Sequence, residues 1–482
     1  MKRQDNFRKN PFALPSRGIK RTFNSEEEFM AWFESRRRAN YFSVEQIPFS
    51  SLRDWYFEQR SRNLAHASGK FFRVAGLRVE TNFGQIRKWD QPIIVQPEIG
   101  ILGIITRRVG GVRYFLMQVK MEPGNVNIVQ LSPTLQATKS NYTQVHGGKL
   151  PAYLEYFTDR KRSRFLVDLL QTEQGGRFFK KRNRNMIVEV DGAVELRDDF
   201  CWLSSWQIRK LLTVDNFVNM DARSVLSCAP FADGNLRKHY ELLRHPGREN
   251  IFPYRFDDSF MNDLIISMSE ESRVANSMDG ILSWFTELKT RYELDVREIP
   301  LNRVSGWVRN DMEIRHKGEE FFSVIAVLVR AGSREVTSWT QPLIKSSSCG
   351  LAGFVTKKIG NVLHFLIQAK VEPGNFDVVE MAPTVSCSNY EARQGTARAA
   401  RFLDLFVNAA PGRVKYSAIQ SEEGGRFFHF QNRCMVVEIE GSARLTIPGN
   451  YIWMTLGQMM ELVRRGYFNI EARCLLTCIG LF

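Results

Sequence analysis

The sequence of 482 residues lacks the features that mark several large classes of protein. It contains no run of about 18 apolar residues, the length that a membrane-spanning helix needs. Its first residues, MKRQDNFRKN, lack the apolar segment of a secretory signal peptide. Disorder is excluded because 43% of the residues are hydrophobic, a proportion typical of globular proteins. We therefore expect a globular protein that does not bind a membrane.

Cysteine pairs and metal-binding motifs are also absent. The seven cysteines form no CxxC pair, and their odd number argues against a disulfide framework. The simplest interpretation is a protein of the reducing cytoplasm. Because the sequence has neither a CxxC pair nor an HxxxH motif, we expect no metal site.

Three common nucleotide-binding and catalytic motifs are missing as well. No GxGxxG follows a predicted strand, and neither GxxxxGKS/T nor GxSxG occurs. A dinucleotide-binding fold, a P-loop and a serine hydrolase elbow each lose their main support.

The charge balance indicates an anionic partner without identifying it. Lys and Arg number 67 against 52 Asp and Glu, which gives a formal net charge of +15. The basic residues are spread along the chain, with short runs such as those at 36–38 and 180–182. Nucleic-acid-binding proteins usually concentrate basic residues in one arm or patch. We therefore expect no nucleic-acid partner.

The most informative feature that is present is one internal duplication. Trp89 and Trp339, which lie 250 positions apart, stand in matching segments. This period far exceeds the roughly 20–50 residues of solenoid repeats, so each repeat is of domain size. We predict two tandem domains, 20–228 and 275–482, joined by a connector at 229–274 that contains several turn signals.

Both repeats mix helical and strand patterns. Apolar residues recur every three or four positions in four segments, which predicts amphipathic helices at 26–38, 204–212, 279–294 and 455–467. Asp279 is the expected N-cap of the third helix. Apolar and β-branched runs predict buried strands at 112–121, 321–330, 362–371 and 435–441. The predicted fold class is α+β, with a mixed sheet flanked by helices in each repeat.

The first motif found in both repeats is Gln-x-Lys-x-Glu-Pro-Gly-Asn, at 118–125 and 368–375. Alternation along a strand places Gln368, Lys370 and Glu372 on one face of a sheet. The Lys–Glu pair either positions a substrate or stabilises the sheet as an ion pair. The spacing alone leaves both interpretations open.

The second motif contains Gly-Gly-Arg, within 171–179 and 420–428. Two successive glycines permit backbone conformations closed to other residues and expose N–H groups to an anion. The arginine that follows can bind phosphate oxygens through two parallel hydrogen bonds. A hairpin turn followed by a surface arginine explains the same residues equally well.

Two further motifs are polar. Asn432-Arg433, with its counterpart in the first repeat, precedes a predicted buried strand. There it either lines the mouth of a pocket or protects a sheet edge from aggregation. A Ser-Asn-Tyr segment at 140–142 and at 388–390 is predicted to be a loop that supplies hydrogen-bond donors.

Together these motifs resemble those of the NDP-hexose 2,3-dehydratases of deoxysugar biosynthesis. The matching segments are QAKVEPGN, APT, SNY, QSEEGGRFFH and QNR of the second repeat, and EQGG and KRNRN of the first. The resemblance covers nearly the whole chain, duplication included. It implies a homodimer whose repeats are similar to the Nudix fold, although the sequence lacks the Nudix box that holds magnesium.

The resemblance also implies an activity, that of a lyase acting on dTDP-4-keto-6-deoxyglucose. Such an enzyme removes the proton of C3, which lies next to the C4 ketone, and expels the C2 hydroxyl. The unstable 3,4-diketo-2,6-dideoxy product is then reduced by a separate NADPH-dependent 3-ketoreductase, and the resulting sugars decorate antibiotics. The chemistry needs a base, an acid and a partner for the enolate oxygen, but no metal or redox cofactor.

The two repeats differ where acid–base groups are needed. Glu423 matches Gln174, and His429 matches Lys180, so the second repeat has two additional groups that exchange protons near neutral pH. We hypothesise that the C-terminal repeat is catalytic and that the N-terminal repeat binds nucleotide or stabilises the dimer. His146 of the first repeat, which has no histidine at its matching position, argues for the reverse.

The candidate site residues follow from the motifs and the resemblance. The acid–base candidates are Glu422, Glu423, His429 and Tyr390, with Lys370 as partner of the enolate oxygen. The expected binding residues are Gln420, Ser421, Gly425, Arg426, Asn432, Arg433 and Arg393 in the second repeat, and Thr143, His146, Gly147, Thr172 and Arg177 in the first. The aromatic faces expected to hold thymine belong to Trp55, Trp89, Trp307 and Trp339.

Two alternative functions stay open at this point. One is a nucleotide-sugar-binding protein in which neither repeat is catalytic. The other is a ketoisomerase acting on the same substrate, because removal of a proton next to a carbonyl serves both reactions.

Overall fold

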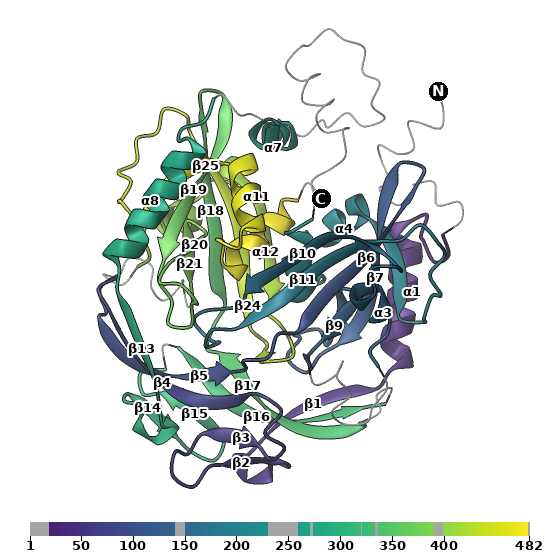
Figure 1. Ribbon diagram of the computed structural model, residues 1–482, viewed down its shortest axis with the longest axis vertical. Coiled ribbons are helices and arrows are strands. Elements are labelled where there is room, and N and C mark those ends of the chain that lie inside the picture. The colour runs from purple at the N-terminus through teal and green to yellow at the C-terminus, as the bar shows by residue number, and fades with distance from the viewer. Residues whose placement is uncertain are drawn as a thin grey trace.

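The computed structural model describes residues 19–139, 150–229, 259–269, 273–319, 321–332, 336–388, 390 and 399–480. Within these residues the strands form two seven-stranded sheets, one six-stranded sheet and one five-stranded sheet. Helices pack against the two larger sheets (Figure 1). This architecture confirms the α+β prediction of two repeated domains with mixed sheets. In the described part of the chain no helix is long and apolar enough to span a membrane.

The first repeat begins with helix α1 (Glu26–Ala39). Its strands are β1 (Phe42–Ile47), β2 (Trp55–Phe57), β3 (Leu64–His66), β4 (Arg73–Thr81), β5 (Lys88–Val95), β6 (Ile101–Val109), β7 (Val112–Met121), β8 (Val129–Ser132), β9 (Leu135–Ala137), β10 (Arg164–Thr172), β11 (Arg182–Glu189) and β12 (Phe200–Ser204). Its other helices are η1 (Phe49–Ser51), α3 (Glu155–Thr158), α4 (Ser205–Leu211) and α5 (Met220–Leu226).

The second repeat begins with helix α8 (Met278–Arg291), after the connector helix α7 (Ser259–Ser269). Its strands are β13 (Leu294–Ile299), β14 (Trp307–Arg309), β15 (Glu313–His316), β16 (Phe322–Ala331), β17 (Ser338–Ser346), β18 (Gly350–Ile359), β19 (Val362–Lys370), β20 (Glu380–Ala382), β21 (Val385–Cys387), β22 (Val414–Ser421), β23 (Phe427–Phe428), β24 (Gln431–Ile439) and β25 (Tyr451–Thr455). Its other helices are η2 (Leu301–Arg303), α10 (Asp404–Val407), η3 (Pro411–Arg413), α11 (Leu456–Arg464) and α12 (Ile470–Cys478).

Each repeat builds one seven-stranded sheet around a parallel pair of strands. In the first repeat the order is β10-β11-β6-β7-β12, with β8 on β7 and β9 on β6. In the second repeat it is β22-β24-β18-β19-β20, with β25 on β19 and β21 on β18. The pairs β11–β6 and β24–β18 are parallel, and the other pairs are antiparallel. The predicted buried strands at 112–121 and 362–371 are confirmed as β7 and β19.

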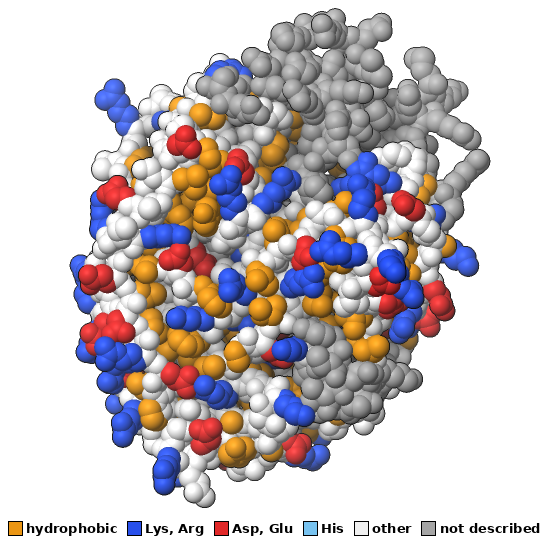
Figure 2. Space-filling model, in the orientation of Figure 1, with side chains coloured by type: hydrophobic (Ala, Val, Ile, Leu, Met, Phe, Trp, Pro, Cys, Tyr) orange, Lys and Arg blue, Asp and Glu red, His pale blue; other side chains and the backbone are white. Residues whose placement is uncertain are grey.

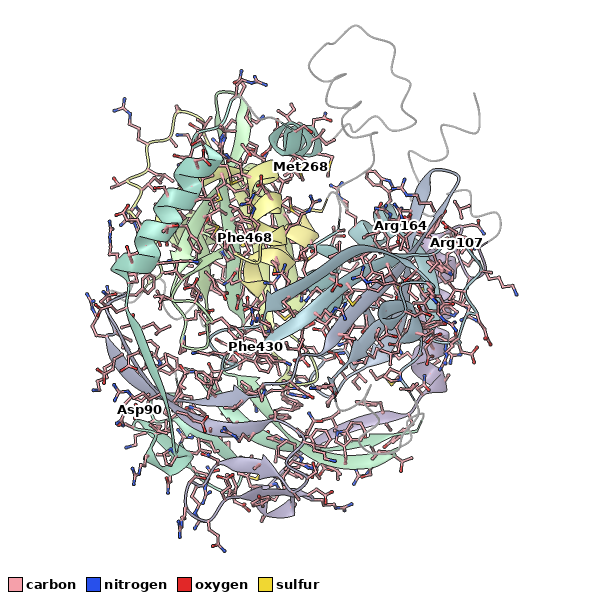
Figure 3. The ribbon with its side chains drawn as sticks, in the orientation of Figure 1. Asp90, Arg107, Arg164, Met268, Phe430 and Phe468 are labelled. Atoms are coloured by element: carbon pink, nitrogen blue, oxygen red, sulfur yellow. The ribbon has the colours of Figure 1, made fainter. Side chains whose placement is uncertain are left out.

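The apolar side chains of the two repeats join in one core. Phe115 of β7 and Phe365 of β19 are both buried in the largest apolar cluster, which contains residues of both larger sheets and their helices. Burying one phenylalanine side chain contributes about 1.5–3 kcal/mol. A separate apolar cluster that contains Phe430 joins the two smaller sheets, and Figure 3 places Phe430 where the larger sheets meet them.

The two smaller sheets exchange one strand between the repeats. Strand β1 of the first repeat pairs with β16 of the second in antiparallel register, with Phe42 opposite Ala331. Strand β13 of the second repeat pairs with β4 of the first, with Leu294 opposite Thr81. Figure 1 shows both crossings, because each smaller sheet contains purple and green strands. Each smaller sheet is therefore complete only when both repeats are present.

A buried arginine from each repeat also reaches into the other repeat. Arg223 of α5 donates to the carbonyl of Ser421, and Arg473 of α12 donates to the carbonyl of Thr172 at 2.7 Å. Both guanidinium groups are buried, a position that is costly unless their N–H groups are satisfied. Because Ser421 and Thr172 are the last residues of β22 and β10, each arginine holds the strand end from which a Gly-Gly-Arg motif departs.

Local capping signals account for the ends of most predicted helices. Thr455 caps α11 and Ser204 caps α4, each with a reciprocal glutamine, as in a capping box. The prediction that Asp279 caps α8 is wrong. The cap is Ser277, whose side chain accepts from the Gly280 N–H at 3.1 Å, and Asp279 lies in the first turn, where its charge favours the helix dipole.

The described part of the connector packs on the second repeat. Ser267 of α7 donates to the carbonyl of Leu363 at 2.5 Å and accepts from the N–H of Leu456 at 2.8 Å. Residues 230–258 and 270–272 lie outside the described residues. On the face shown in Figure 2, Lys and Arg side chains are scattered among acidic ones, in keeping with their dispersion along the sequence.

The strand exchange gives a direct expectation about folding. Expressed alone, residues 1–229 lack the partner that β13 supplies to β4, and residues 230–482 lack the partner that β1 supplies to β16. We expect each fragment to aggregate or stay unfolded, because an unpaired sheet edge and half of the common core are exposed. Co-expression of the two fragments should give a soluble 1:1 complex on size-exclusion chromatography. Two separately folded, monomeric fragments would contradict this interpretation.

Candidate active site

The motifs that occur in both repeats meet crosswise. The Pro-Gly-Asn turn of the first repeat (123–125) packs on the Gly-Gly-Arg loop of the second (424–426), where Gly124 N–H donates to the carbonyl of Gly424 at 2.7 Å. The Pro-Gly-Asn turn of the second repeat (373–375) packs in the same way on the Gly-Gly-Arg loop of the first (175–177). Each of the two resulting sites therefore contains residues of both repeats.

Close backbone approach explains the glycines of these turns and loops. A Cβ atom at Gly124 would overlap the carbonyl oxygen of Phe427, and one at Gly424 would overlap the side chain of Asn125. The left-handed conformation belongs to a residue beyond the two glycines of this loop, His429, which has a φ of 50°. The N–H of His429 donates to the carbonyl of Gly124 at 2.8 Å and closes the contact. The loop is thus a turn held between repeats, and phosphate binding by it stays a prediction.

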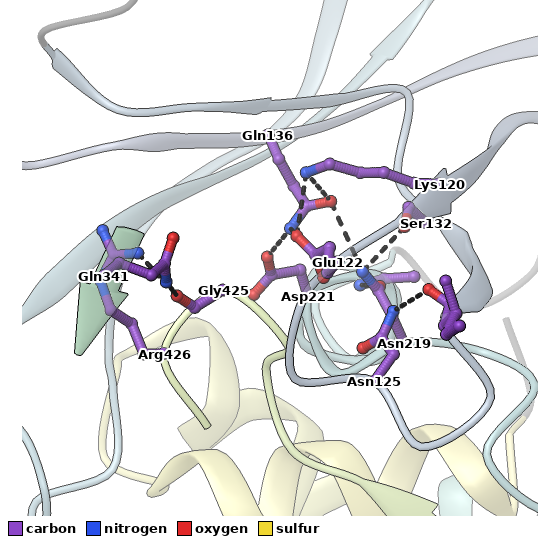
Figure 4. Close-up of polar contacts among 12 residues, drawn as sticks. Lys120, Glu122, Asn125, Ser132, Gln136, Asn219, Asp221, Gln341, Gly425 and Arg426 are labelled. Atoms are coloured by element: carbon purple, nitrogen blue, oxygen red, sulfur yellow. Dashed lines mark hydrogen bonds and ion pairs between the residues drawn. The ribbon is translucent and has the colours of Figure 1, made fainter. Parts of the chain in front are cut away.

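One site, which we call the first cluster, consists of Lys120, Glu122, Gln136 and Asp221 from the first repeat and Glu423 from the second. Figure 4 shows the four residues of the first repeat. Lys120 Nζ lies 3.1 Å from Glu122 Oε1 and donates to Gln136 Oε1 at 2.8 Å. The Gln136 amide donates in turn to Asp221 Oδ2. Glu122 packs beside Gly424, the residue after Glu423, so three carboxyl groups and one ammonium group share this site.

Burial dominates the electrostatics of the first cluster. It raises the pKa of Asp221 well above the usual value, and the neighbouring Glu423 and Glu122 carboxylates raise it further. Burial also raises the pKa of Glu423 to about 7, a shift that Arg426 opposes and that Glu122 and Glu173 reinforce. Because a carboxyl group titrating near neutral pH can both hold and release a proton, the cluster suits acid–base chemistry.

The equivalent site, which we call the second cluster, consists of Lys370, Glu372, Ser386 and Glu471 from the second repeat and Gln174 from the first. Lys370 Nζ lies 2.8 Å from Glu372 Oε1 and 3.4 Å from Ser386 Oγ. Burial and the nearby Glu372 raise the pKa of Glu471 to about 8, and Lys370 opposes this shift. The second cluster therefore differs from the first in that Ser386 replaces Gln136 and Gln174 replaces Glu423. In addition, Glu380 lies opposite Lys370, where Gln130 lies opposite Lys120 in the first repeat.

The crosswise packing separates two residues that were predicted to act together. Glu423 and Lys370 both belong to the second repeat, but Glu423 lies in the first cluster and Lys370 in the second. The predicted strand-face arrangement of Lys370 and Glu372 is confirmed as an ion pair.

Glu422 lies in the packed interior between the two clusters. Its Oε1 accepts from the Asn432 amide, and its Oε2 accepts from the Gln174 amide at 2.6 Å. Glu173, its counterpart, accepts from Asn183 at 2.6 Å. Both oxygens of Glu422 are thus occupied by amides, an arrangement that fits a carboxyl group that joins the repeats. An acid–base role for Glu422 stays a prediction.

The arginine of each Gly-Gly-Arg loop lies on a phenylalanine ring. The Arg426 guanidinium stands 4.3 Å from the ring centroid of Phe72, and its Nε donates to Gln96 at 3.3 Å. The Arg177 guanidinium stands 4.3 Å from the ring centroid of Phe322, and burial lowers its pKa. A cation over an aromatic face contributes about 0.5–2 kcal/mol, so these contacts fix the loops to the smaller sheets.

Two of the predicted tryptophans form hydrogen bonds next to the loops. Trp89 Nε1 donates to Gln91 at 2.9 Å, and Trp339 Nε1 donates to Gln341 at 2.8 Å. The indole N–H groups are thus engaged inside the protein. Thymine stacking on the two rings stays a prediction.

The other two tryptophans pack in the smaller sheets. Trp55 is buried, and its ring meets the edge of His66 at 5.2 Å between centroids. Trp307 meets His316 at 5.6 Å in the equivalent place, and its N–H donates to the carbonyl of Asp90 at 3.0 Å. Both contacts are typical of a structural aromatic pair.

Several predicted residues stand apart from both clusters. The exposed His429 imidazole stacks on Phe428 with centroids 4.0 Å apart, so His429 meets the site through its backbone only. The buried Tyr390 hydroxyl accepts from Arg433 Nε at 3.3 Å. Three other predicted side chains form hydrogen bonds between the repeats: Gln420 with Leu212, Ser421 with Gln130, and Thr172 with Glu380. Arg393, Thr143, His146 and Gly147 lie outside the described residues.

Sequence reasoning missed the members of the clusters that no motif singled out. Asp221 and Glu471 start the equivalent helices α5 and α12, each followed by Ala-Arg, and this acidic residue before the repeated Ala-Arg was the available signal. No group of three His, Cys, Asp or Glu side chains suited to a metal occurs among the residues that the structure describes.

Comparison with known proteins points to one family. A sequence profile described as NDP-hexose 2,3-dehydratase matches residues 26–229 and 278–479. The chain is 45% identical over 458 residues to a protein of Saccharopolyspora spinosa, and this match covers 94% of the chain and 90% of the relative. A relative from Amycolatopsis orientalis is 44% identical with the same coverage, and one from Streptomyces violaceoruber is 40% identical, with 94% of the chain and 96% of the relative covered. All three are named dTDP-4-dehydro-6-deoxy-alpha-D-glucopyranose 2,3-dehydratase.

The Glu423 carboxyl makes stability depend on pH. Its pKa is about 7 in the folded protein against 4.5 for the ordinary group, so folding favours the protonated form. This contribution is fully present below about pH 4.5 and is lost as the pH rises toward 7. Glu423→Gln removes the titration, so we expect the variant to gain thermal stability over the parent between pH 5 and pH 8.

Thermal unfolding at several pH values checks this expectation. Glu461→Gln, on the surface of α11, is the matched control and should follow the parent at every pH. Identical pH profiles of the parent and the Glu423→Gln variant would contradict the burial of an ionisable carboxyl at this place.

Proposed function

Because the chain belongs to the NDP-hexose 2,3-dehydratase family, we propose that it removes water across C2 and C3 of dTDP-4-keto-6-deoxyglucose. The C3 proton and the C2 hydroxyl leave together as one water molecule. The resulting C2–C3 enol rearranges to the 3,4-diketo-2,6-dideoxy sugar nucleotide. In this proposal the protein is a carbon–oxygen lyase.

We assign the reaction to the first cluster, and one observation carries this assignment. There the Lys–Glu pair meets Asp221 of the same repeat and Glu423 of the opposite repeat, and the pKa values of both carboxyl groups are raised. In the second cluster the carboxyl groups with raised pKa values next to Glu372 are Glu471 and Glu380, and both belong to the second repeat. At the equivalent place of the second cluster, Gln174 replaces Glu423. An amide has no proton to exchange near neutral pH, so the second cluster lacks the carboxyl group that the opposite repeat supplies to the first cluster.

The charge of each side chain in the first cluster suggests its role in the proposed reaction. Glu122, which is ion-paired with Lys120, is the carboxylate that removes the C3 proton. The Lys120 ammonium stabilises the enolate oxygen that forms at C4. A protonated Glu423 or Asp221 gives its proton to the departing C2 hydroxyl. Each acid or base contributes about 10²–10⁴-fold to the rate, and the enolate partner about 3–4 kcal/mol.

Further features belong to the same proposal. The enzyme acts as a homodimer of two Nudix-like repeats, at 20–228 and 275–482, and passes its unstable product to a separate NADPH-dependent 3-ketoreductase that serves antibiotic biosynthesis. Seven cysteines outside any disulfide support a reducing compartment such as the cytoplasm. Thymine on a tryptophan face and diphosphate on Arg426 complete the proposed substrate contacts.

Turnover in heavy water tests the reaction. The protein is incubated with dTDP-4-keto-6-deoxyglucose in D₂O, with and without a 3-ketoreductase and NADPH, and products are identified by mass spectrometry and NMR. Loss of the C2 oxygen is the expected result. Deuterium exchange without elimination would instead show an isomerase, and an unchanged substrate would show a binding protein.

Variants of equivalent residues test the site. We expect Glu423→Gln and Asp221→Asn each to lower kcat by about 10²–10⁴-fold, because each removes a proton donor. Glu471→Gln, the counterpart of Asp221 in the second cluster, is the matched control and should turn over at a rate near that of the parent. A larger loss for Glu471→Gln than for Asp221→Asn would move the reaction to the second cluster.

A further inference from the structure

A glutamine on strand β17 holds the loop that carries Glu423. Gln341 Nε2 donates to the carbonyl of Gly425 at 2.9 Å (Figure 4). Gln341 Oε1 accepts from Trp339 Nε1 at 2.8 Å. Gly425 lies two residues after Glu423 in the Gly-Gly-Arg loop. A continuous chain of hydrogen bonds therefore runs from the tryptophan, through the amide, to the loop.

The orientation of the Gln341 amide is determined by its two partners. The indole N–H of Trp339 can only donate, and the carbonyl of Gly425 can only accept. The amide must therefore turn its oxygen to Trp339 and its NH₂ group to Gly425. Loss of the indole N–H would leave the amide free to rotate, so Trp339 acts through Gln341.

The rigidity of β17 makes this contact an anchor. Strand β17 pairs with β16 over nine consecutive residues, with Gln341 opposite Val327, and with β23 through Ile344 and Phe427. The N–H of Ile344 also donates to the carbonyl of Arg426 at 2.8 Å. The loop is thus held by a six-stranded sheet on one side and by the Pro-Gly-Asn turn of the first repeat on the other.

The anchor has a direct consequence for Glu423. Gly424 is held by the Gly124 N–H, and Gly425 is held by Gln341, so both residues that follow Glu423 are bonded through their carbonyls. These bonds fix the loop that holds the Glu423 carboxyl against Gly425 and near the Glu122 charge. Displacement of a catalytic group by about 1 Å is enough to cost about 10²-fold in rate.

We propose that Gln341, oriented by Trp339, is a positioning residue that sets the place of Glu423 in the first cluster. The proposal rests on the proposed function for its kinetic part only. Gln341 touches neither substrate nor the reacting groups in this account. It acts through the carbonyl of Gly425.

The first repeat supplies a matched control. Gln91 donates to the carbonyl of Gly176 at 2.9 Å and accepts from Trp89 at 2.9 Å, in the same arrangement. The loop that Gln91 holds carries Gln174, which does not titrate. Loss of the two glutamines should therefore have similar effects on stability and different effects on chemistry.

The experiment compares Gln341→Leu, Gln341→Glu and Gln91→Leu in the full chain. Gln341→Glu keeps the shape and the bond from Trp339 but loses the donor to Gly425, so it tests the contact without a change in packing. The Glu423 carboxyl is titrated by difference infrared spectroscopy against the Glu423→Gln variant, and kcat is measured across the same pH range.

We expect both Gln341 variants to lower kcat by about 10²-fold. We also expect the Glu423 titration to move to lower pH, because water reaches the carboxyl once the loop is loosened. Gln91→Leu should leave the titration and kcat near the parent values. Unchanged titration in the Gln341 variants, or an equal shift in Gln91→Leu, would overturn the proposal.

The infrared measurement separates this proposal from the proposed function. If the parent protein fails to release water from the sugar while Gln341→Glu still moves the Glu423 titration, the reaction is wrong and the positioning role stands. If the parent is an active dehydratase and both Gln341 variants keep its kcat and its titration, the positioning role is wrong and the reaction stands.

Discussion

The crossed contact between each Pro-Gly-Asn turn and the Gly-Gly-Arg loop of the opposite repeat organises the molecule. Gly124 N–H bonds Gly424 at 2.7 Å, and Gly374 N–H bonds Gly175 at 2.7 Å. Each hydrogen bond contributes only about 0.5–1.5 kcal/mol. Their importance is geometric, because they bring carboxyl groups from distant parts of the chain into one site. The strand exchange and the buried arginines serve the same crossing on a larger scale.

Duplication has produced two sites that share one backbone arrangement and differ in their ionisable side chains. A Lys–Glu pair and an acidic residue in the first turn of a helix, with a raised pKa, are present in both clusters. One difference between the clusters is Glu423 of the first and Gln174 of the second, two residues that follow equivalent strand ends. A carboxyl group in that interior place titrates near neutral pH, whereas an amide stays neutral and joins the repeats through Glu422. Burial thus gives one substitution a large chemical effect.

Local features of the fold could be predicted from the sequence, and long-range ones could not. Helix α11 and strand β19 were predicted because their periodicity and capping residues are contained in a few neighbouring positions. The exchange of β1 and β13 depends on pairing between segments more than 200 residues apart, which no local pattern reports. For the same reason the sequence shows that Glu423 differs from its counterpart but gives no sign of its neighbours. We expected Glu423 to lie with Lys370, and the crossing brings it near Lys120 and Glu122 instead.

The most direct test of the account is a pair of double-mutant cycles on kcat. Glu423→Gln is combined with Glu122→Gln in one cycle and with Glu372→Gln, the counterpart of Glu122 in the second cluster, in the other. The account predicts strong non-additivity for Glu423 with Glu122, because the two carboxyl groups act in one site, and additivity for Glu423 with Glu372. Coupling of Glu423 to Glu372 without coupling to Glu122 would contradict a site shared between the repeats.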